Sequence, residues 1–510
     1  MYMQVTHLAC FVLILALDVK GEIRQKDFVV LQSRKVTNVQ STVFSRSRLF
    51  CAKSCLNAGN CTSASYNSSN NECLFSTDGL IDIINVNDNN MATILMKGTS
   101  SANGNQFGKT FFTGFMSNSR NTPGTPKLVI ISANLSQVLT NVLVTIPYLG
   151  IYQEPHMFGE SLHLQYSSSL MPALTSNVSF KGVEIVSDQP IALYSINHRS
   201  LSVDGTLELP KEEWGLLYIV GTHNSSLWGT GQILVIAADD NTDVLLEFPT
   251  GPSLTVALNK HETYQFQANE LEPIAGTIVS ANNPVVVHAG HACANIPNHD
   301  AVFCDFIMEN MPPLNTLGSV FVVPYQRTRT MYTIGIAAPH DATTVDIWDV
   351  NGYPLETIVM NRQDSTFRSF YASEILSITS SQNILVTQYG HGSSNIYGDP
   401  SLTIIPALTQ FTNRCNFEIP TFFIDPSVVS IVIDSASDVS GLKLNGSAIV
   451  AAASTSVIIP GVGSFNVIYI DVIGNVTYSL IHDVTHVRFG AILFARTAES
   501  EFTTVLGYGL

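Results

Sequence analysis

The feature that most constrains the fold is an internal duplication that begins at Lys109. An apolar strand, a polar turn and an alternating strand recur about 100 residues apart. A second marker follows each of the first three copies, and a third precedes each new cycle. The first marker starts at Leu128, Ile233, Tyr332 and Val429; the second starts at Ser187, Ala281 and Ser380, with a degenerate copy at Val487.

The repeats predict a mainly β protein. Their segments are short, rich in β-branched residues and separated by Asn, Asp and Gly, without sustained helical periodicity. Each repeat has room for about six to eight strands, which suits four tandem β-sandwiches. A closed, propeller-like ring with two blades per repeat is the alternative.

A cysteine cluster marks a separate N-terminal module over residues 22–97. Cys51, Cys55, Cys61 and Cys73 crowd an Asn/Ser-rich segment that is too small for a large apolar core, so disulfides are expected. The sequence predicts a short helix that carries Cys51 and Cys55, followed by strands at "TSASYN" and "CLFST". We expect Cys51–Cys73 and Cys55–Cys61 among the three connectivities that four cysteines allow.

The same residues carry a first family resemblance. The helical C-x3-C, a third cysteine, the Tyr66-Asn67 pair and "ECLF" resemble the PAN/apple module over about 75 residues. The resemblance implies a small α+β module, stapled by disulfides, that binds proteins or carbohydrates and is not catalytic.

Several sequence features predict a secreted glycoprotein. "HLACFVLILAL" has the length of a signal-peptide core, which predicts a signal peptide over residues 1–21; a buried N-terminal strand is the alternative. A Gly/Ser/Asn linker is expected at 98–108, and no later apolar stretch is long enough to span a bilayer. Glycosylation is expected at the sequons of Asn60, Asn67, Asn134, Asn177, Asn224, Asn445 and Asn475.

A second resemblance covers roughly residues 109–510. The segment 283–325 holds a Pro-Val-Val strand, Gly290, Cys293, Cys304-Asp305, "ENMPP" and "LGSVFVVP". These pieces resemble the N-terminal domain of the IgG Fc-binding protein family, which is associated with mucus. The resemblance implies an extracellular binding domain. The D modules and cysteine-rich repeats of the large family member are missing, so binding of immunoglobulin Fc is not carried over.

Composition narrows the function classes. Charged residues make up 13% of the chain and the net charge is −16, with no basic run. Nucleic acid and anionic membrane surfaces are therefore not expected as partners. No cofactor is expected either.

Four patterns could be functional sites, and we prefer a structural interpretation for each. His288 and His291 have the spacing of metal ligands, but alternation along a strand separates their faces, and Cys293 is the natural disulfide partner of Cys304. A hydrolase using His391 and Ser393 lacks a nucleophile elbow. The acidic turn Asp239–Asp243 is a calcium candidate without EF-hand spacing. Trp214, Trp228 and Trp348 are expected in the core. Catalytic and metal residues are therefore predicted to be none.

Cys415 is left without a partner, and it is either a buried thiol or an intermolecular link. The sequence as a whole predicts a secreted recognition or adhesion protein, not an enzyme. Its expected partners are extracellular proteins or glycans, including mucins and microbial surfaces. A structural mucus or matrix subunit, dimerised through Cys415, is the alternative, and a secreted hydrolase is the less favoured one.

Overall fold

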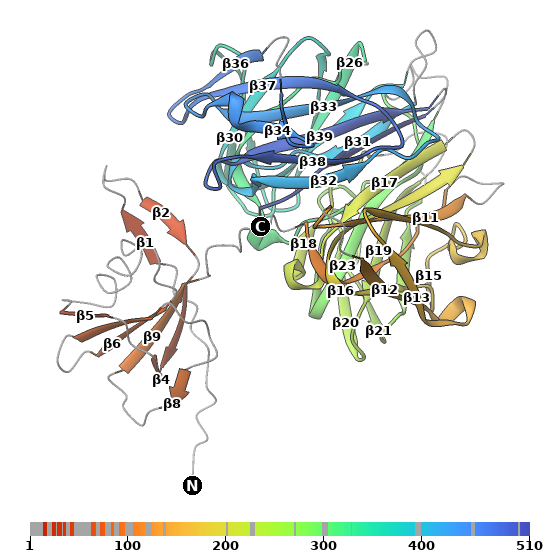
Figure 1. Ribbon diagram of the computed structural model, residues 1–510, viewed down its shortest axis with the longest axis horizontal. Helices are drawn as coiled ribbons and strands as arrows, with labels where there is room; N and C mark the ends of the chain where they lie inside the picture. The colour runs from red at the N-terminus through yellow and green to blue at the C-terminus, as the bar shows by residue number, and fades with distance from the viewer. Residues whose placement is uncertain are drawn as a thin grey trace. The chain divides into compact units, whose positions relative to one another are not determined.

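The chain divides into two compact units in a computed structural model, residues 1–101 and residues 102–510 (Figure 1). The structure describes nine strands between residues 14 and 96. It also describes residues 106–509 except for short gaps at 119–123, 136–138, 200–201, 225–229, 270–271, 298–303, 328, 393–398, 450–453 and 498–499.

The first unit is built around a five-stranded sheet in the order β3-β9-β6-β7-β5. Its strands are β3 (Phe28–Gln32), β5 (Ser41–Phe44), β6 (Ser63–Asn67), β7 (Glu72–Ser76) and β9 (Met91–Met96). Two antiparallel pairs accompany it: β1 (Ile14–Leu17) with β2 (Ile23–Lys26), and β4 (Arg34–Val36) with β8 (Ile83–Asn85).

The strands expected at "TSASYN" and "CLFST" are confirmed as β6 and β7. The apolar stretch expected to be a signal peptide contains β1. The predicted helix and the side chains of Cys51, Cys55, Cys61 and Cys73 lie outside the described residues, as do those of Asn60 and Asn67.

The second unit contains four repeats. Repeat 1 consists of β10 (Gly108–Thr113), β11 (Thr125–Ser132), β12 (Thr140–Ile146), β13 (Ile151–Phe158), β14 (Ser161–Gln165), β16 (Val183–Arg199) and β17 (Ser202–Glu208). Repeat 2 consists of β18 (Gly215–Ile219), β19 (Gly231–Ala237), β20 (Thr242–Glu247), β21 (Leu254–Leu258), β22 (Thr263–Gln267), β23 (Ile278–Ala294) and β24 (Asp305–Asn310). Repeat 3 consists of β25 (Gly318–Val323), β26 (Met331–Ala337), β27 (Thr343–Trp348), β28 (Pro354–Met360), β29 (Ser365–Tyr371), β30 (Leu376–Gly390) and β31 (Ser401–Ile404).

Among the described residues, repeat 4 has nine strands where repeats 1 to 3 have seven each. It consists of β32 (Arg414–Glu418), β33 (Ile424–Asp434), β34 (Leu442–Leu444), β35 (Ser447–Ala448), β36 (Ser454–Ile459), β37 (Gly463–Val472), β38 (Thr477–His482), β39 (Phe489–Arg496) and β40 (Glu501–Val505). One further short strand, β15 (Asn177–Ser179), pairs with β22 of repeat 2. Short 3-10 turns η4 (Lys211–Glu213), η5 (Leu314–Thr316) and η6 (Leu408–Gln410) link successive repeats; others are η2 (Pro147–Leu149), η3 (Ser168–Leu170) and η7 (Val439–Gly441).

One long strand organises each of the first three repeats. In repeat 1 the first half of β16 pairs with β10 and β12, and its second half pairs with β11 and β17. The same pairings recur around β23 and β30. The long strand thus belongs to both layers of a sandwich, which confirms the predicted β-sandwiches. In repeat 4 it is replaced by two strands, β38 and β39.

The alternation of burial follows from this arrangement. The outer strand β12 alternates buried and exposed residues, as a sheet with one solvated face does. The last strand of each repeat (β17, β24, β31 and β40) is buried at every residue, so both faces are covered. These four strands therefore lie innermost in the unit.

The four last strands also close a ring. β17 contacts β24, β24 contacts β31, β31 contacts β40, and β40 contacts β17. Side chains make several of these links: Thr206 Oγ1 donates to Glu309 Oε2 at 2.6 Å, and Thr503 Oγ1 donates to the Leu402 carbonyl at 2.9 Å. The structure therefore combines the two expected architectures. Four sandwiches form a closed ring, with one sandwich per repeat where the alternative had two blades.

The centre of the ring is polar. Glu208 is fully buried and accepts hydrogen bonds from Thr113 Oγ1 at 2.6 Å, Asn310 Nδ2 at 2.9 Å and the Ser195 hydroxyl, while its Oε2 lies 3.0 Å from His288 Nε2. Because unpaired polar groups are costly in a core, this network fixes how repeats 1 and 2 meet.

Candidate functional site

The boundaries between repeats differ, and the difference produces a site. At the boundary of repeats 1 and 2, the turn around His261 meets the start of β16, and the Gly182 N–H donates to the His261 carbonyl at 2.9 Å. At the boundary of repeats 2 and 3, the equivalent glycine is Gly276. A Cβ on Gly276 would lie 2.1 Å from the Gln363 carbonyl oxygen. Both boundaries need a glycine because the neighbouring backbone approaches so closely.

An ion pair accompanies each of these two close contacts. Lys260 Nζ lies 3.0 Å from Glu184 Oε1 across the first boundary, and Arg362 Nη2 lies 2.8 Å from Glu247 Oε2 across the second. Glu184 and Glu247 belong to the outer sheets, β16 and β20, of the preceding repeats. At both boundaries, a basic turn residue therefore forms an ion pair with an acidic residue of the preceding repeat.

The boundary of repeats 3 and 4 lacks both elements. Strand pairing aligns Ile278 with Ser377, so the position of Gly276 is occupied by Ile375. The turn hydrogen bonds align Asp364 with Ser464, so the position of Arg362 is occupied by Val462. The Ile375 side chain blocks the close approach and no cation is supplied from the position of Val462, so this boundary stays open at those two positions. Repeats 3 and 4 are joined beside the opening, where the Ile458 N–H donates to the Val350 carbonyl at 3.0 Å and Arg327 Nη1 lies 3.2 Å from Asp471 Oδ1.

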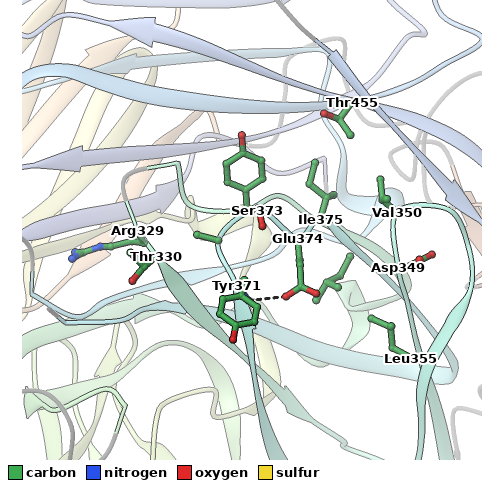
Figure 2. A pocket seen from close by; sticks show the side chains of 13 residues that line it. Arg329, Thr330, Asp349, Val350, Leu355, Tyr371, Ser373, Glu374, Ile375 and Thr455 are labelled. Atoms are coloured by element: carbon green, nitrogen blue, oxygen red, sulfur yellow. Dashed lines mark hydrogen bonds between the residues drawn. The ribbon is translucent and has the colours of Figure 1, made fainter. Parts of the chain in front are cut away.

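A groove of about 770 Å³ occupies the open boundary (Figure 2). Its lining comes from three loops of repeat 3 and from β36 of repeat 4. In Figure 2, Arg329 and Thr330 lie on one side, Asp349, Val350 and Leu355 lie on the other, and Tyr371, Ser373 and Glu374 lie between them. The remaining lining residues are Tyr325, Ala372, Ile375, Leu376 and Thr455.

Two carboxylates in the groove are held in place by turns. Asp349 Oδ1 accepts from the backbone N–H groups of Asn351 at 2.9 Å and Tyr353 at 2.8 Å. Glu374 Oε2 accepts from the Tyr371 N–H at 2.7 Å. The groove therefore presents two fixed acidic groups above an apolar floor.

The basic residue in the lining does not neutralise them. Arg329 is buried, forms an ion pair with Glu501, and donates from Nη2 to the Asp399 carbonyl at 2.5 Å. Its guanidinium is directed away from Glu374 in Figure 2. Tyr371 is 66% exposed beside Glu374, so the mouth of the groove carries an aromatic ring in water.

A second groove of about 720 Å³ lies where repeat 4 meets repeat 1. It is lined by Glu160, Ser161 and Glu418 together with the sequon residues Asn445 and Asn475. Both asparagines are exposed, so glycans attached there would occupy this groove. The groove between repeats 3 and 4 has no sequon asparagine in its lining and is the better candidate for an exogenous ligand.

The other sequons are placed as follows. Asn134 and Asn177 are exposed. Asn224 is partly buried and accepts from the Ala275 N–H through its side-chain oxygen at 3.3 Å.

The histidine and cysteine candidates are structural in this fold. His288 is buried against Glu208, and His291 Nδ1 accepts from the Cys293 N–H at 3.1 Å. Burial lowers the pKa of His291 to about 3, with a contribution from His223. Cys293 and Cys304 form a disulfide, with their Cα atoms 5.0 Å apart. Among the described residues, no cluster of three or more His, Cys, Asp or Glu is arranged to hold a metal ion.

The histidine of the hydrolase hypothesis makes a buried structural contact. His391 is buried, its Nε2 lies 2.7 Å from Thr333 Oγ1, and burial lowers its pKa to about 4. Ser393 lies outside the described residues.

The acidic turn 239–243 is occupied by internal contacts. Asp239 pairs with Lys211 at 3.3 Å, and Asp240 Oδ1 accepts from the Lys260 N–H at 3.0 Å. These contacts support the interpretation of a structural turn.

The tryptophans that were expected in the core are only half-buried where the structure describes them, whereas the unpaired cysteine is fully buried. Trp214 and Trp348 are half-buried, and their indole N–H groups donate to the Leu209 carbonyl at 2.9 Å and to Thr379 Oγ1 at 3.0 Å. Trp228 lies outside the described residues. Cys415 is fully buried in β32, and burial raises the pKa of its thiol.

Sequence reasoning missed the groove. None of its residues carries a motif, and only a comparison of Gly182 and Gly276 with Ile375 would have indicated an open boundary.

Comparison with known proteins identifies the family. The model of the IgGFc binding protein family matches residues 204–494, more than half of the chain, and the PAN domain model matches residues 26–95. The chain therefore belongs to the IgGFc-binding protein family, a non-catalytic binding family, and carries an N-terminal PAN domain. Both matches point to an extracellular protein. The family match begins in β17, whereas repeat 1 has the strand order of repeats 2 and 3.

The human IgGFc-binding protein is 25% identical over 319 residues, which cover 59% of this chain and 6% of that protein. The chain thus spans a small fraction of this relative. Among solved structures, trypsin-activated alpha-2-macroglobulin from Escherichia coli aligns with a TM-score of 0.15 at 7% identity, covering 88% of this chain and 46% of that one. A score that low carries no argument. Within the described residues, no helix has the length and apolarity to cross a membrane.

Proposed function

We propose that the protein is secreted and acts in extracellular recognition or adhesion, binding proteins or glycans in mucus, matrix or innate defence. The observation that carries the proposal is the groove between repeats 3 and 4. At the two preceding boundaries, an ion pair occupies the corresponding place. A rigid ring that presents polar loops around a groove is the usual design of a binding scaffold. Mucins and microbial surfaces are the partners that we would examine first.

The N-terminal PAN domain supports the same proposal, because it adds a second module of a kind expected to bind proteins or carbohydrates. Glycosylation at the exposed sequons would be compatible with this role. The disulfide pairs expected within the module, Cys51–Cys73 and Cys55–Cys61, remain part of the proposal.

The alternative of a structural subunit dimerised through Cys415 is less well supported. A disulfide between chains needs an accessible thiolate, whereas this thiol has no exposed surface and its pKa is raised by burial. A hydrolase is disfavoured by the burial of His391 and by its hydrogen bond with Thr333.

The test uses the secreted full-length chain on a glycan array, a mucin panel, bacterial surfaces and immunoglobulin Fc fragments. The Fc fragments are included because the human relative is named for them. Selective binding of at least one class is expected. Absence of binding throughout, with disulfide-linked multimers on a non-reducing gel, would instead favour the structural subunit.

A further inference from the structure

We propose that the groove between repeats 3 and 4 accepts a lysine or arginine side chain from a basic segment of a partner protein. This inference rests on the proposed function and names the ligand chemistry of the same site. Four observations support it: the boundary that lacks the ion pair of the other two, two fixed carboxylates, an exposed aromatic ring and the acidity of the whole chain.

The ring itself supplies the precedent for this ligand. At the boundary of repeats 2 and 3, the Arg362 guanidinium reaches Glu247, and the Gln363 side-chain amide donates to the Glu247 carbonyl at 2.7 Å. At the boundary of repeats 1 and 2, the cation is Lys260. Two of the three boundaries between consecutive repeats thus bind a cationic side chain from the next repeat.

The third boundary has neither the acidic nor the basic residue at the equivalent positions, but a carboxylate lies next to the acidic position. The position of Glu247 is occupied by Trp348 through the paired residues Ile278 and Ser377, and the carboxylate of Asp349 follows one residue later. Val462, at the position of Arg362, is 49% exposed. An external cation would therefore take a role that an internal one fills elsewhere.

The two carboxylates retain capacity for a ligand. Asp349 uses Oδ1, and Glu374 uses Oε2, for the turn hydrogen bonds. Within the part of the chain that the structure describes, Asp349 Oδ2 and Glu374 Oε1 have no hydrogen-bond partner. Ammonium and guanidinium groups donate to such oxygens in charge-assisted hydrogen bonds, which are stronger than neutral ones.

The remaining lining suits the stem of a basic side chain. Leu355 is 48% exposed and Tyr371 is 66% exposed, while Val350 and Ile375 supply an apolar floor. Long basic side chains lay their methylene groups on apolar surface, and their cationic heads are attracted to aromatic faces. The net charge of −16 favours encounter with a basic partner and disfavours sulfated or sialylated glycans.

The experiment measures binding of fluorescein-labelled octa-arginine to the secreted full-length chain by fluorescence anisotropy. The neutral probe is the corresponding octa-citrulline peptide, which keeps the shape of the side chain and removes its charge. The groove variant is the double substitution Asp349→Asn with Glu374→Gln. Each amide retains the oxygen that accepts the turn hydrogen bonds, so the fold is expected to be preserved.

The matched control is Glu272→Gln with Asp434→Asn, which changes the net charge by the same amount outside the groove. Glu272 accepts from the Asn269 N–H at 2.9 Å just as Glu374 accepts from Tyr371, and Asp434 accepts from the Ala436 N–H at 2.8 Å. Neither control residue lines the groove.

The inference predicts that octa-arginine binds and octa-citrulline does not. It also predicts that the groove variant weakens binding about tenfold or more, whereas the control changes it less than about twofold. Equal weakening by both double variants would assign the effect to overall charge and overturn the inference. The inference would also be overturned if the groove substitutions reduced binding of a neutral glycan and left octa-arginine binding unchanged.

Failure of the inference is distinguishable from failure of the proposed function. If the chain binds a member of the extracellular panel but not octa-arginine, the ligand chemistry proposed here is wrong and the binding function stands. If it binds neither, both proposals fail.

Discussion

Replacement of Glu208 by alanine tests the closed ring at its centre. The Glu208 carboxylate is fully buried and accepts from Thr113 and Ser195 of repeat 1 and from Asn310 of repeat 2. It also pairs with His288 of repeat 2 at 3.0 Å. Four polar groups on four strands therefore lose their common partner in the Glu208→Ala protein.

The structure sets the magnitude of this effect. Each buried polar group that loses its hydrogen-bond partner typically costs about 1–3 kcal/mol, and Glu208→Ala removes the shared partner of several such groups. We expect a loss of about 4 kcal/mol in the free energy of unfolding. Glu208→Gln should cost roughly 1–3 kcal/mol, since the Thr113 and Ser195 hydroxyls can reverse and accept from the new amide.

Urea unfolding of the full-length chain, followed by tryptophan fluorescence, measures the change. The control is Asp471→Ala, which removes a surface ion pair with Arg327 at 3.2 Å and should cost less than about 1 kcal/mol. If Glu208→Ala is as stable as the control, Glu208 does not lie at a buried junction of two repeats, and the description of the ring centre is wrong.

Three further predictions concern other parts of the ring. Gly276→Ala should lower the midpoint of thermal unfolding more than Gly150→Ala, because both glycines have positive φ (90° and 72°) but only Gly276 faces a neighbour within 4 Å; equal midpoints would contradict the close approach to Gln363. Burial and the neighbouring His391 hold the pKa of His223 near 4, below its unfolded value, so stability is lost as pH falls through about 6.5. His223→Phe should therefore remove roughly 2.5 kcal/mol of the loss between pH 7 and pH 4.5, measured by urea unfolding at both values; an unchanged loss would show that His223 is not buried as a neutral ring. The thiol of Cys415 should react with a maleimide only after denaturation, as mass spectrometry would show, and rapid labelling of the native chain would reopen the dimer hypothesis.

Much of the fold could be predicted from the sequence because the recurring apolar segments mark the positions of the strands. The markers that start at Leu128 and Ile233 overlap β11–β12 and β19–β20, and the markers at Ser187 and Ala281 overlap β16 and β23. The pairing partners of these segments could not be predicted. A period-2 pattern does not reveal that one 17-residue strand serves two sheets, since burial alternates at the start of β16 and is continuous over most of its second half.

The sequence allowed a closed ring as an alternative, but the side chains that meet at its centre and the groove could not be predicted. Residues such as Glu208 and Glu309 look like surface acids in a strand, yet they lie buried at the centre, because strand contacts between distant repeats enclose them. The groove depends on what is missing at one boundary, namely a glycine and a basic residue. Such a difference becomes visible only when equivalent positions of the repeats are aligned by their hydrogen bonds.

The central claim is that the open boundary between repeats 3 and 4 is the binding site. The most direct test is to fill it with Thr455→Trp, because Thr455 lines the groove from the exposed strand β36. Ser456→Trp is the matched control, since the adjacent residue points to the opposite face of the strand and does not line the groove. We expect Thr455→Trp to abolish binding of whichever extracellular partner the panel identifies, and Ser456→Trp to bind it like the wild-type chain. Unchanged binding in Thr455→Trp would place the recognition site elsewhere.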